Sequence, residues 1–219
     1  MRLLLFLGLS CFAQTQITLV GDSTVAEGGG WGPGFRAALA GKAQVRNLAR
    51  NGRSSKSFRD EGAWTPAIDG SANFILIQFG HNDCPGKGPA RETLPATTYR
   101  QNLIDYLREA RQAGATPVLV TSIVRRNFTP ENTIKPDCLI PFVAQTRLLA
   151  AQTNTPLIDM YALTRALSES IGPQASDVLG PVAKDGMPDR THLSPEGQKQ
   201  IGAIAAREFL RLFPQSPNH

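Results

Sequence analysis

Short apolar segments alternate with longer segments of helical periodicity along most of this chain, and that alternation restricts the fold more than any other feature. Five apolar segments rich in branched residues are typical of strands. They are residues 17–20, 45–48, 74–79, 117–121 and 156–159. Because parallel strands are joined by long right-handed crossovers, a repeated order of strand and helix predicts a parallel sheet with helices on both faces.

Two of the intervening segments show the clearest helical patterns. Apolar side chains recur on one face through residues 99–110, and Gly114 marks the end of that helix. A second pattern covers residues 201–212 and follows Ser194-Pro195, a common helix start. The sequence therefore predicts the α/β class, as a three-layer α/β/α sandwich with a five-stranded parallel sheet.

Length and charge exclude several classes of protein. The 219 residues suffice for one sizeable hydrophobic core and are too few for two domains that each bury a core of that size. The formal net charge is +5, but Lys and Arg are scattered among 18 acidic residues, so we expect no nucleic-acid partner. No segment approaches the roughly 20 apolar residues of a membrane helix, so we expect no stable membrane insertion. We expect the chain to act as a monomer.

The N-terminal residues have the pattern of an export signal. An apolar run over residues 3–9 is followed by the small side chains of Cys11 and Ala13, which suit a signal peptidase. We therefore predict a signal peptide at residues 1–13 and one folded domain at residues 15–213. The expected location is secreted or periplasmic.

The three cysteines raise two further questions. Lipid attachment at Cys11 is a minor alternative to cleavage, because Gly8 stands where the lipidation signal prefers Leu. Cys84 and Cys138 follow the third and fourth strands, which are neighbours in a sheet with the expected strand order 2-1-3-4-5. In an exported chain they could form a disulfide, and two buried thiols are an equal alternative.

Polar residues follow the first three strands and precede the last helix. The carboxyl ends of parallel strands meet at one edge of the sheet, where ligand sites of such sheets lie. The first turn of the last helix lies at the same edge if that helix packs antiparallel to the strands. We therefore expect four distant segments to converge there. They are Gly21-Asp22-Ser23-Thr24, Asn51-Gly52-Arg53-Ser54-Ser55, Gly80-His81-Asn82-Asp83 and Asp189-Arg190-Thr191-His192.

These segments contain the residue types that nucleophilic acyl transfer requires. The Ser23 hydroxyl becomes a good nucleophile if the His192 imidazole takes its proton. Asp189 precedes His192 by three residues and can hold the imidazole in the correct tautomer. The backbone amides of Ser23 and Gly52 and the side-chain amide of Asn82 can stabilise an oxyanion. Each signal alone is weak, but their joint placement at one sheet edge favours a hydrolase.

The same motifs resemble the four sequence blocks of the SGNH, or GDSL-type, hydrolases, over roughly residues 16–212. This resemblance implies a flavodoxin-like fold with Ser23, Asp189 and His192 as the triad and no cofactor. Together with Gly30-Trp31-Gly32, the motifs are similar to those of rhamnogalacturonan acetylesterases and related carbohydrate deacetylases. The implied substrate is an acetylated plant polysaccharide or oligosaccharide.

Three more residues are candidates for contact with substrate. His81 adjoins Asn82, but a histidine in a tight loop is more often held by a backbone carbonyl, and we favour that structural role. Trp31 could stack on a sugar, although we favour a place in the core. Arg53 belongs to a small basic group that would suit an acidic galacturonate chain or, equally, a solvated helix face.

Other functions compete with this interpretation. The glycines of residues 28–34 do not fit G-x-G-x-x-G, and three histidines are too few for a spaced zinc site, so we expect no nucleotide and no metal. A lipid esterase or thioesterase would use the same triad, although no amphipathic lid helix is visible. A non-catalytic carbohydrate-binding protein is the remaining alternative, which only an assay separates from an esterase.

Overall fold

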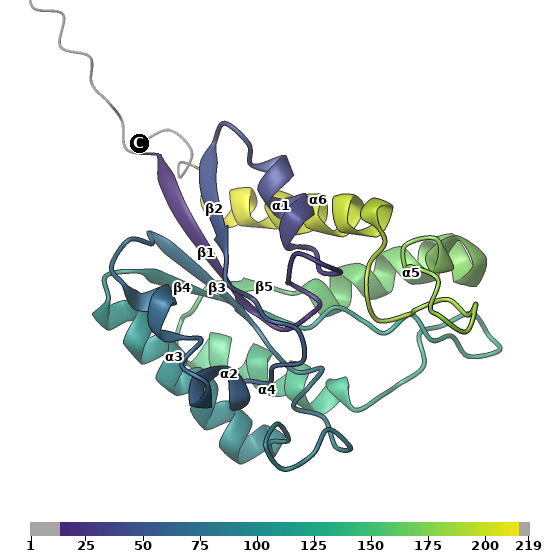
Figure 1. Ribbon diagram of the computed structural model, residues 1–219, viewed down its shortest axis with the longest axis horizontal. Coiled ribbons are helices and arrows are strands. Elements are labelled where there is room, and N and C mark those ends of the chain that lie inside the picture. The colour runs from purple at the N-terminus through teal and green to yellow at the C-terminus, as the bar shows by residue number, and fades with distance from the viewer. Residues whose placement is uncertain (1–13, 215–219) are drawn as a thin grey trace, which may run out of the picture.

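The computed structural model describes residues 14–214 and contains a parallel five-stranded sheet between two layers of helices (Figure 1). The strand order is β2-β1-β3-β4-β5, and every neighbouring pair is parallel. The strands are β1 (Thr15–Gly21), β2 (Ala43–Asn47), β3 (Phe74–Gln78), β4 (Thr116–Val120) and β5 (Leu157–Ile158). Each predicted strand is present, so the predicted fold class and strand order are confirmed.

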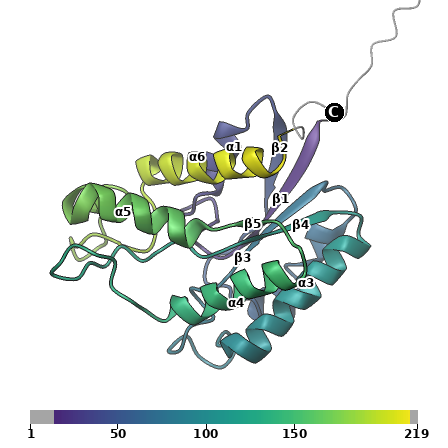
Figure 2. The ribbon, with the colours of Figure 1, turned by 180° about the vertical axis from the view of Figure 1, so that it is seen from behind.

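Helices cover both faces of the sheet. Figure 2 shows α1 and α6 on one face and α3 and α4 on the other. The helices are α1 (Gly32–Ala38), α2 (Ser57–Asp60), α3 (Arg100–Gln112), α4 (Leu139–Gln152), α5 (Met160–Asp177) and α6 (Pro195–Leu212), with the short turns η1 (Thr65–Ile68) and η2 (Pro95–Tyr99). Gly172, which has a positive φ of 78°, kinks α5 just before Pro173. The α3 and α6 helices match the two predicted helical patterns.

The strands divide the apolar core into two clusters, one on each face. Successive side chains of a strand point to opposite faces. On β3, Ile75 and Ile77 therefore join the cluster that includes α3 and α4, whereas Leu76 joins the cluster that includes α1 and α6. Both faces of the central strands are thus buried, which explains why these segments are almost continuously apolar in sequence.

The close packing of α1 on α6 depends on glycine. A side chain at Gly34 would begin 1.8 Å from the carbonyl oxygen of Gln198, and one at Gly202 would begin 2.3 Å from the amide nitrogen of Phe35. The two helix backbones therefore touch. The Ser194 hydroxyl caps α6 by accepting a hydrogen bond from the amide of Gly197. These contacts fix the start of α6, three residues after His192.

Two predictions concern membrane and export. None of the helices among residues 14–214 has the length and apolar character that crossing a membrane would require. The predicted signal peptide at residues 1–13, with Cys11, lies outside the described residues.

Candidate active site

The structure brings the three residues of the predicted triad together. The Ser23 hydroxyl follows β1, and its oxygen lies 2.9 Å from Nε2 of His192, 169 positions later in the chain. Nδ1 of the same ring lies 2.8 Å from Oδ2 of Asp189. The side chains of His192 and Asp189 are 37% and 27% exposed, so water reaches both. This geometry supplies a continuous path of hydrogen bonds from a carboxylate to a hydroxyl.

The second oxygen of Asp189 shapes the loop that carries the imidazole. Its Oδ1 accepts hydrogen bonds from the amides of Thr191, at 2.8 Å, and His192, at 3.0 Å. Partial burial on its own would raise the pKa of Asp189, but the hydrogen bonds from His192 and Thr191 outweigh it, so the pKa lies below its usual value. Asp189 is therefore a carboxylate at neutral pH, the form that accepts a hydrogen bond from Nδ1–H of His192.

Arg126 holds this loop from behind, and the sequence analysis did not identify it. Its Nη2 donates to the backbone carbonyls of Asp189, at 2.8 Å, and His192, at 2.7 Å. The residue is 3% exposed, and burial lowers its pKa to about 10, so it still carries its charge. The signal that could have revealed it is an arginine that follows directly on the apolar strand β4 and its extension.

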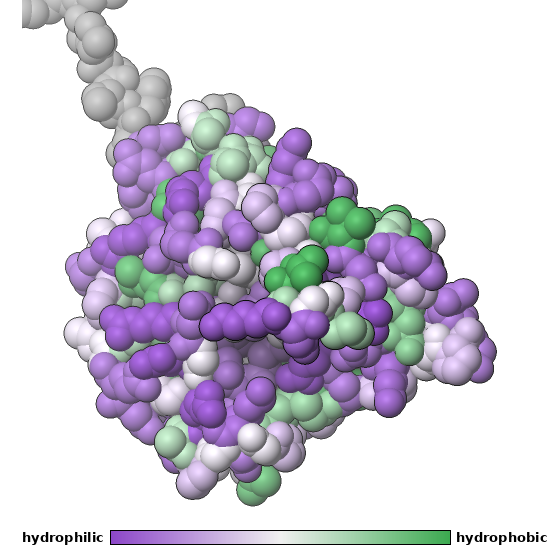
Figure 3. Space-filling model, turned by 45° about the vertical axis from the view of Figure 1, so that its right-hand side comes forward, coloured by the Kyte–Doolittle hydropathy of each residue, from purple (hydrophilic) through white to green (hydrophobic). Residues whose placement is uncertain are grey.

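The triad opens into a pocket of about 490 Å³ that also contains the predicted oxyanion donors. Its lining residues are Ser23, Gly28, Gly29, Asn51, Gly52, Asn82, Pro181, Asp189 and His192. The amide nitrogen of the Asn82 side chain donates one hydrogen bond to the carbonyl of Arg53, at 3.2 Å, which leaves its second N–H available. The φ of Gly52 is +76°, a conformation that favours glycine. Figure 3 shows a mostly hydrophilic face with a hollow across its middle.

A buried chain of polar side chains supports the loop that carries Ser23. Oδ1 of Asp22 accepts from the amide and the hydroxyl of Thr24, at 2.9 and 2.7 Å. The Gln78 amide donates to the Thr24 hydroxyl, at 2.7 Å, and accepts from the indole N–H of Trp31, at 2.8 Å. Trp31 is 1% exposed, so the favoured place in the core is confirmed and the alternative, stacking on a sugar, is wrong.

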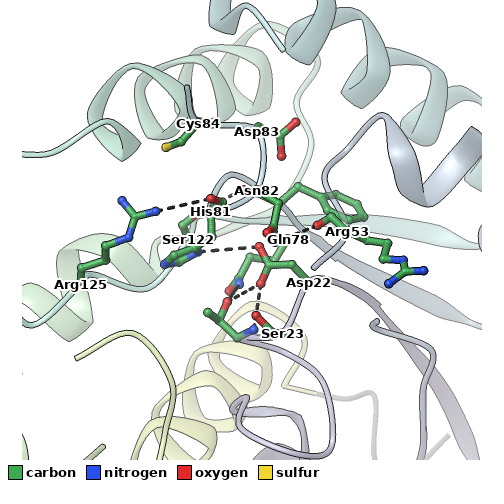
Figure 4. Close-up of polar contacts among 12 residues, drawn as sticks. Asp22, Ser23, Arg53, Gln78, His81, Asn82, Asp83, Cys84, Ser122 and Arg125 are labelled. Carbon is green, nitrogen blue, oxygen red and sulfur yellow. Dashed lines mark hydrogen bonds and ion pairs between the residues drawn. The ribbon is translucent and has the colours of Figure 1, made fainter. Parts of the chain in front are cut away.

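His81 differs from both sequence-based expectations. It is 4% exposed and does not line the pocket, so the suggestion that it contacts substrate is wrong. Neither ring nitrogen has a hydrogen-bond partner among the described residues, so no backbone carbonyl holds the ring. Its Nδ1 instead faces Oδ2 of Asp22 at 3.7 Å (Figure 4). Burial, and then the charge of Arg125, lowers the pKa of His81 well below its ordinary value, while burial raises the pKa of Asp22.

Arg53 contributes to the site through its backbone. Its carbonyl accepts from Asn82, while its side chain donates to the Glu61 carboxylate and to the carbonyl of Asn51, both at 2.8 Å. The guanidinium extends away from Ser23 in Figure 4 and does not line the pocket. The structure therefore pairs this side chain with Glu61 and Asn51 outside the pocket and gives no support to the suggested contact with substrate.

The loop that carries Asn82 is anchored at its end. Cys84 is joined by a disulfide to Cys138, which immediately precedes α4, so of the two alternatives left open by the sequence the structure has the disulfide. The neighbouring Asp83 carboxylate is fully buried and accepts hydrogen bonds from Ser55 and Thr93. Burial raises the pKa of Asp83 to about 7 in spite of these bonds.

Comparison with known proteins decides the family. The model of the GDSL-like lipase/acylhydrolase family matches residues 19–200. The chain belongs to this family. As a GDSL-like acylhydrolase it is a carboxylic ester hydrolase, and its strand order and the placement of Ser23 at the end of β1 agree with that assignment.

The chain is similar to a named acetylesterase and to solved structures of the same fold. The rhamnogalacturonan acetylesterase RhgT of Bacillus subtilis is 34% identical over 208 residues, covering 87% of this chain and 88% of RhgT. The solved structure of YxiM from the same organism has a TM-score of 0.78 and 26% identity, covering 91% of this chain and 57% of YxiM. The acetyl xylan esterase AlAXEase, with a TM-score of 0.67 and 18% identity, covering 90% of this chain and 99% of its own, shares the fold.

Proposed function

We propose that this protein is a carbohydrate acetylesterase that removes acetyl groups from pectic rhamnogalacturonan or a related plant saccharide. One observation supports the proposal above all others. The hydrogen bonds from Asp189 through His192 to Ser23 end in a pocket that also contains Gly52 and Asn82, in a chain 34% identical to a rhamnogalacturonan acetylesterase.

The proposed reaction has two acyl transfers. His192 Nε2 takes the proton of the Ser23 hydroxyl while the serine oxygen bonds to the acetyl carbonyl carbon. The amides of Ser23, Gly52 and Asn82 stabilise the oxyanion, each donor contributing about 3 kcal/mol. The imidazolium then protonates the sugar oxygen as its bond to the carbonyl carbon breaks, which releases the sugar hydroxyl and leaves an acetyl-serine. Water, deprotonated by His192, attacks this ester and releases acetate.

The surroundings of the pocket favour a polar and acidic substrate. The pocket lining is largely glycine, asparagine and the triad itself, and it offers no apolar channel for a long acyl chain. The guanidinium of Arg91 lies at its edge, 3.8 Å from where a side chain on Gly52 would begin. Arg91 donates through Nε to the carbonyl of Lys87 and has no carboxylate partner among the described residues. It is therefore free to attract the carboxylate of a uronic acid.

Acetate release tests this proposal. The protein should deacetylate acetylated rhamnogalacturonan faster than acetylated xylan, and should hydrolyse 4-nitrophenyl acetate much faster than the octanoate. The Ser23→Ala variant should lose this activity, whereas Ser170→Ala on the exposed side of α5 should retain it. A preference for the octanoate would replace the proposal with a lipid esterase. Saccharide binding without any ester hydrolysis would indicate a non-catalytic protein.

We further propose that the chain is exported. Two features support this: the apolar run of residues 3–9 followed by small residues, and the Cys84–Cys138 disulfide, because disulfides persist in oxidising compartments. Expression of the full chain in a bacterial host, followed by fractionation and N-terminal sequencing, tests it. The expected product lies outside the cytosol and begins at Gln14. An uncleaved cytosolic product with free thiols would contradict export.

A further inference from the structure

We propose that a second pocket beside the candidate active site binds the carboxylate of a uronic acid in the same saccharide chain. The inference rests on the proposed function, and it assigns the binding of the polymer to residues outside the triad. The second pocket measures about 490 Å³, within the usual range of small-ligand sites. It is lined mainly by Arg125, Asn127, Phe128, Lys135, Asp137 and Arg190.

The second pocket is built on the loops that carry the triad. Arg190 directly follows Asp189, and its carbonyl accepts from the amide of Arg126, at 2.8 Å. Arg126 in turn holds the carbonyls of Asp189 and His192. On the other side, Nη2 of Arg125 donates to the carbonyl of His81, next to Asn82, as Figure 4 shows. A saccharide with one sugar at Ser23 therefore has the second pocket within reach along its chain.

The charges in this pocket favour an anion. Its one lining carboxylate, Asp137, is already engaged, because Oδ2 pairs with Arg125 at 2.8 Å and Oδ1 accepts from the amide of Leu139 at 2.9 Å. Arg190 forms two hydrogen bonds with Asp177, at 2.8 and 3.0 Å. Lys135 is exposed and has no carboxylate partner among residues 14–214. Its ammonium is the uncompensated positive charge of the pocket.

The remaining walls suit a sugar better than a simple inorganic anion. The exposed amide of Asn127 offers both a donor and an acceptor for hydroxyl groups. The half-buried ring of Phe128 gives an apolar surface against which the C–H face of a pyranose can pack. The antiparallel bridge between Phe128 and Ile134 holds these two residues and Lys135 in one small hairpin. A uronic acid carries the carboxylate, the hydroxyls and the apolar face that this set would contact.

Direct binding tests the assignment without relying on catalysis. The probe is an unacetylated galacturonic acid hexamer, titrated calorimetrically against the full protein. Lys135→Gln should raise its Kd about tenfold, since a hydrogen bond to a charged group is lost. Asn127→Asp, which is nearly isosteric and adds a negative charge, should raise the Kd further. Lys42→Gln removes an equally exposed lysine in the turn before β2, at the opposite edge of the sheet, and should not change the Kd.

Kinetics then separate this inference from the proposed function. The ratio of kcat/KM on an acetylated pectic oligosaccharide to kcat/KM on an acetylated xylo-oligosaccharide should fall about tenfold in Lys135→Gln, through KM. If Lys135→Gln and Lys42→Gln have equal Kd values and equal ratios, the second pocket does not bind the carboxylate. This conclusion holds whether or not the proposed function is correct. If the protein binds the hexamer through Lys135 but releases no acetate from pectin, the second pocket stands and the proposed function fails.

Discussion

Two loops that flank Ser23 contribute to the candidate site, and they are fixed in opposite ways. Residues 80–84, which carry Asn82, are buried and end in the disulfide at Cys84. Residues 189–192 are partly exposed and are held by hydrogen bonds, mainly from Arg126. The difference matches what each loop must do. In the proposed mechanism, an oxyanion donor has only to keep its orientation, whereas an acid and base must gain and lose a proton.

The two loops also contain the two imidazoles of the described chain, each near a carboxylate. In the exposed pair, His192 and Asp189 share a hydrogen bond of 2.8 Å. In the buried pair, His81 and Asp22 approach to 3.7 Å without one. The same residue types therefore give a proton-transfer pair only where a hydrogen bond and solvent access occur together. Four changes to these loops test the comparison.

The largest effect is expected from Asp189→Asn. The amide would hold His192 in the wrong tautomer, so kcat for 4-nitrophenyl acetate should fall about 10⁴-fold. Asp185→Asn, an exposed substitution four residues earlier, is the matched control and should leave kcat within about twofold of the wild type. Circular dichroism would show that both variants are folded. A decrease in kcat smaller than tenfold in Asp189→Asn would remove the orienting role of Asp189.

Loss of the disulfide should have the next largest effect. The bridge closes a loop with a sequence separation of 54 residues. The Cys84→Ser/Cys138→Ser double variant should therefore lose roughly 4 kcal/mol of unfolding free energy, measured in urea. Wild-type protein with a reducing agent should behave like the double variant. An unchanged unfolding midpoint would mean that the buried contacts of Asp83 fix the loop without the bridge.

Burial of Asp83 should make stability depend on pH. Its pKa is raised to about 7 in the folded chain, above the usual value near 4, so the folded state binds the proton more tightly than the unfolded state. The contribution of this group is complete below pH 4 and is lost as the pH rises through 7. Between pH 5 and 8 the wild type should lose on the order of 2 kcal/mol more than Asp83→Asn. The exposed Asp60→Asn should keep the wild-type pH dependence.

The sequence predicted the sheet and the triad for the same reason. Apolar segments mark the strands, and Ser23, Gly52, Asn82 and the Asp189–His192 segment each stand near a strand end or helix start, so the fold alone brings them together. Side-chain partners within that frame depend on packing, which the sequence pattern does not encode. Trp31 is buried because Gln78, on another element, accepts its N–H.

Side-chain partners also account for the residues that the sequence placed differently or missed. Glu61 takes the side chain of Arg53, and the carbonyls that Arg126 binds lie more than 60 positions away. His81 is the most instructive of these, because an adjacent Asn82 in the pocket gave no information on where the imidazole points.

The smallest effect on kcat is expected at His81, the imidazole of the buried pair. Neither ring nitrogen donates or accepts a hydrogen bond among the described residues, so replacing the ring with an apolar side chain of similar volume leaves no new polar group unpaired. The His81→Leu variant should therefore keep kcat within about tenfold of the wild type, whereas His192→Leu should lose several orders of magnitude. Steady-state kinetics on 4-nitrophenyl acetate, with thermal unfolding as the control for folding, measures both. A hundredfold fall in kcat in a folded His81→Leu protein would show that the buried imidazole takes part in the chemistry through Asp22, and the distinction between the two pairs would fail.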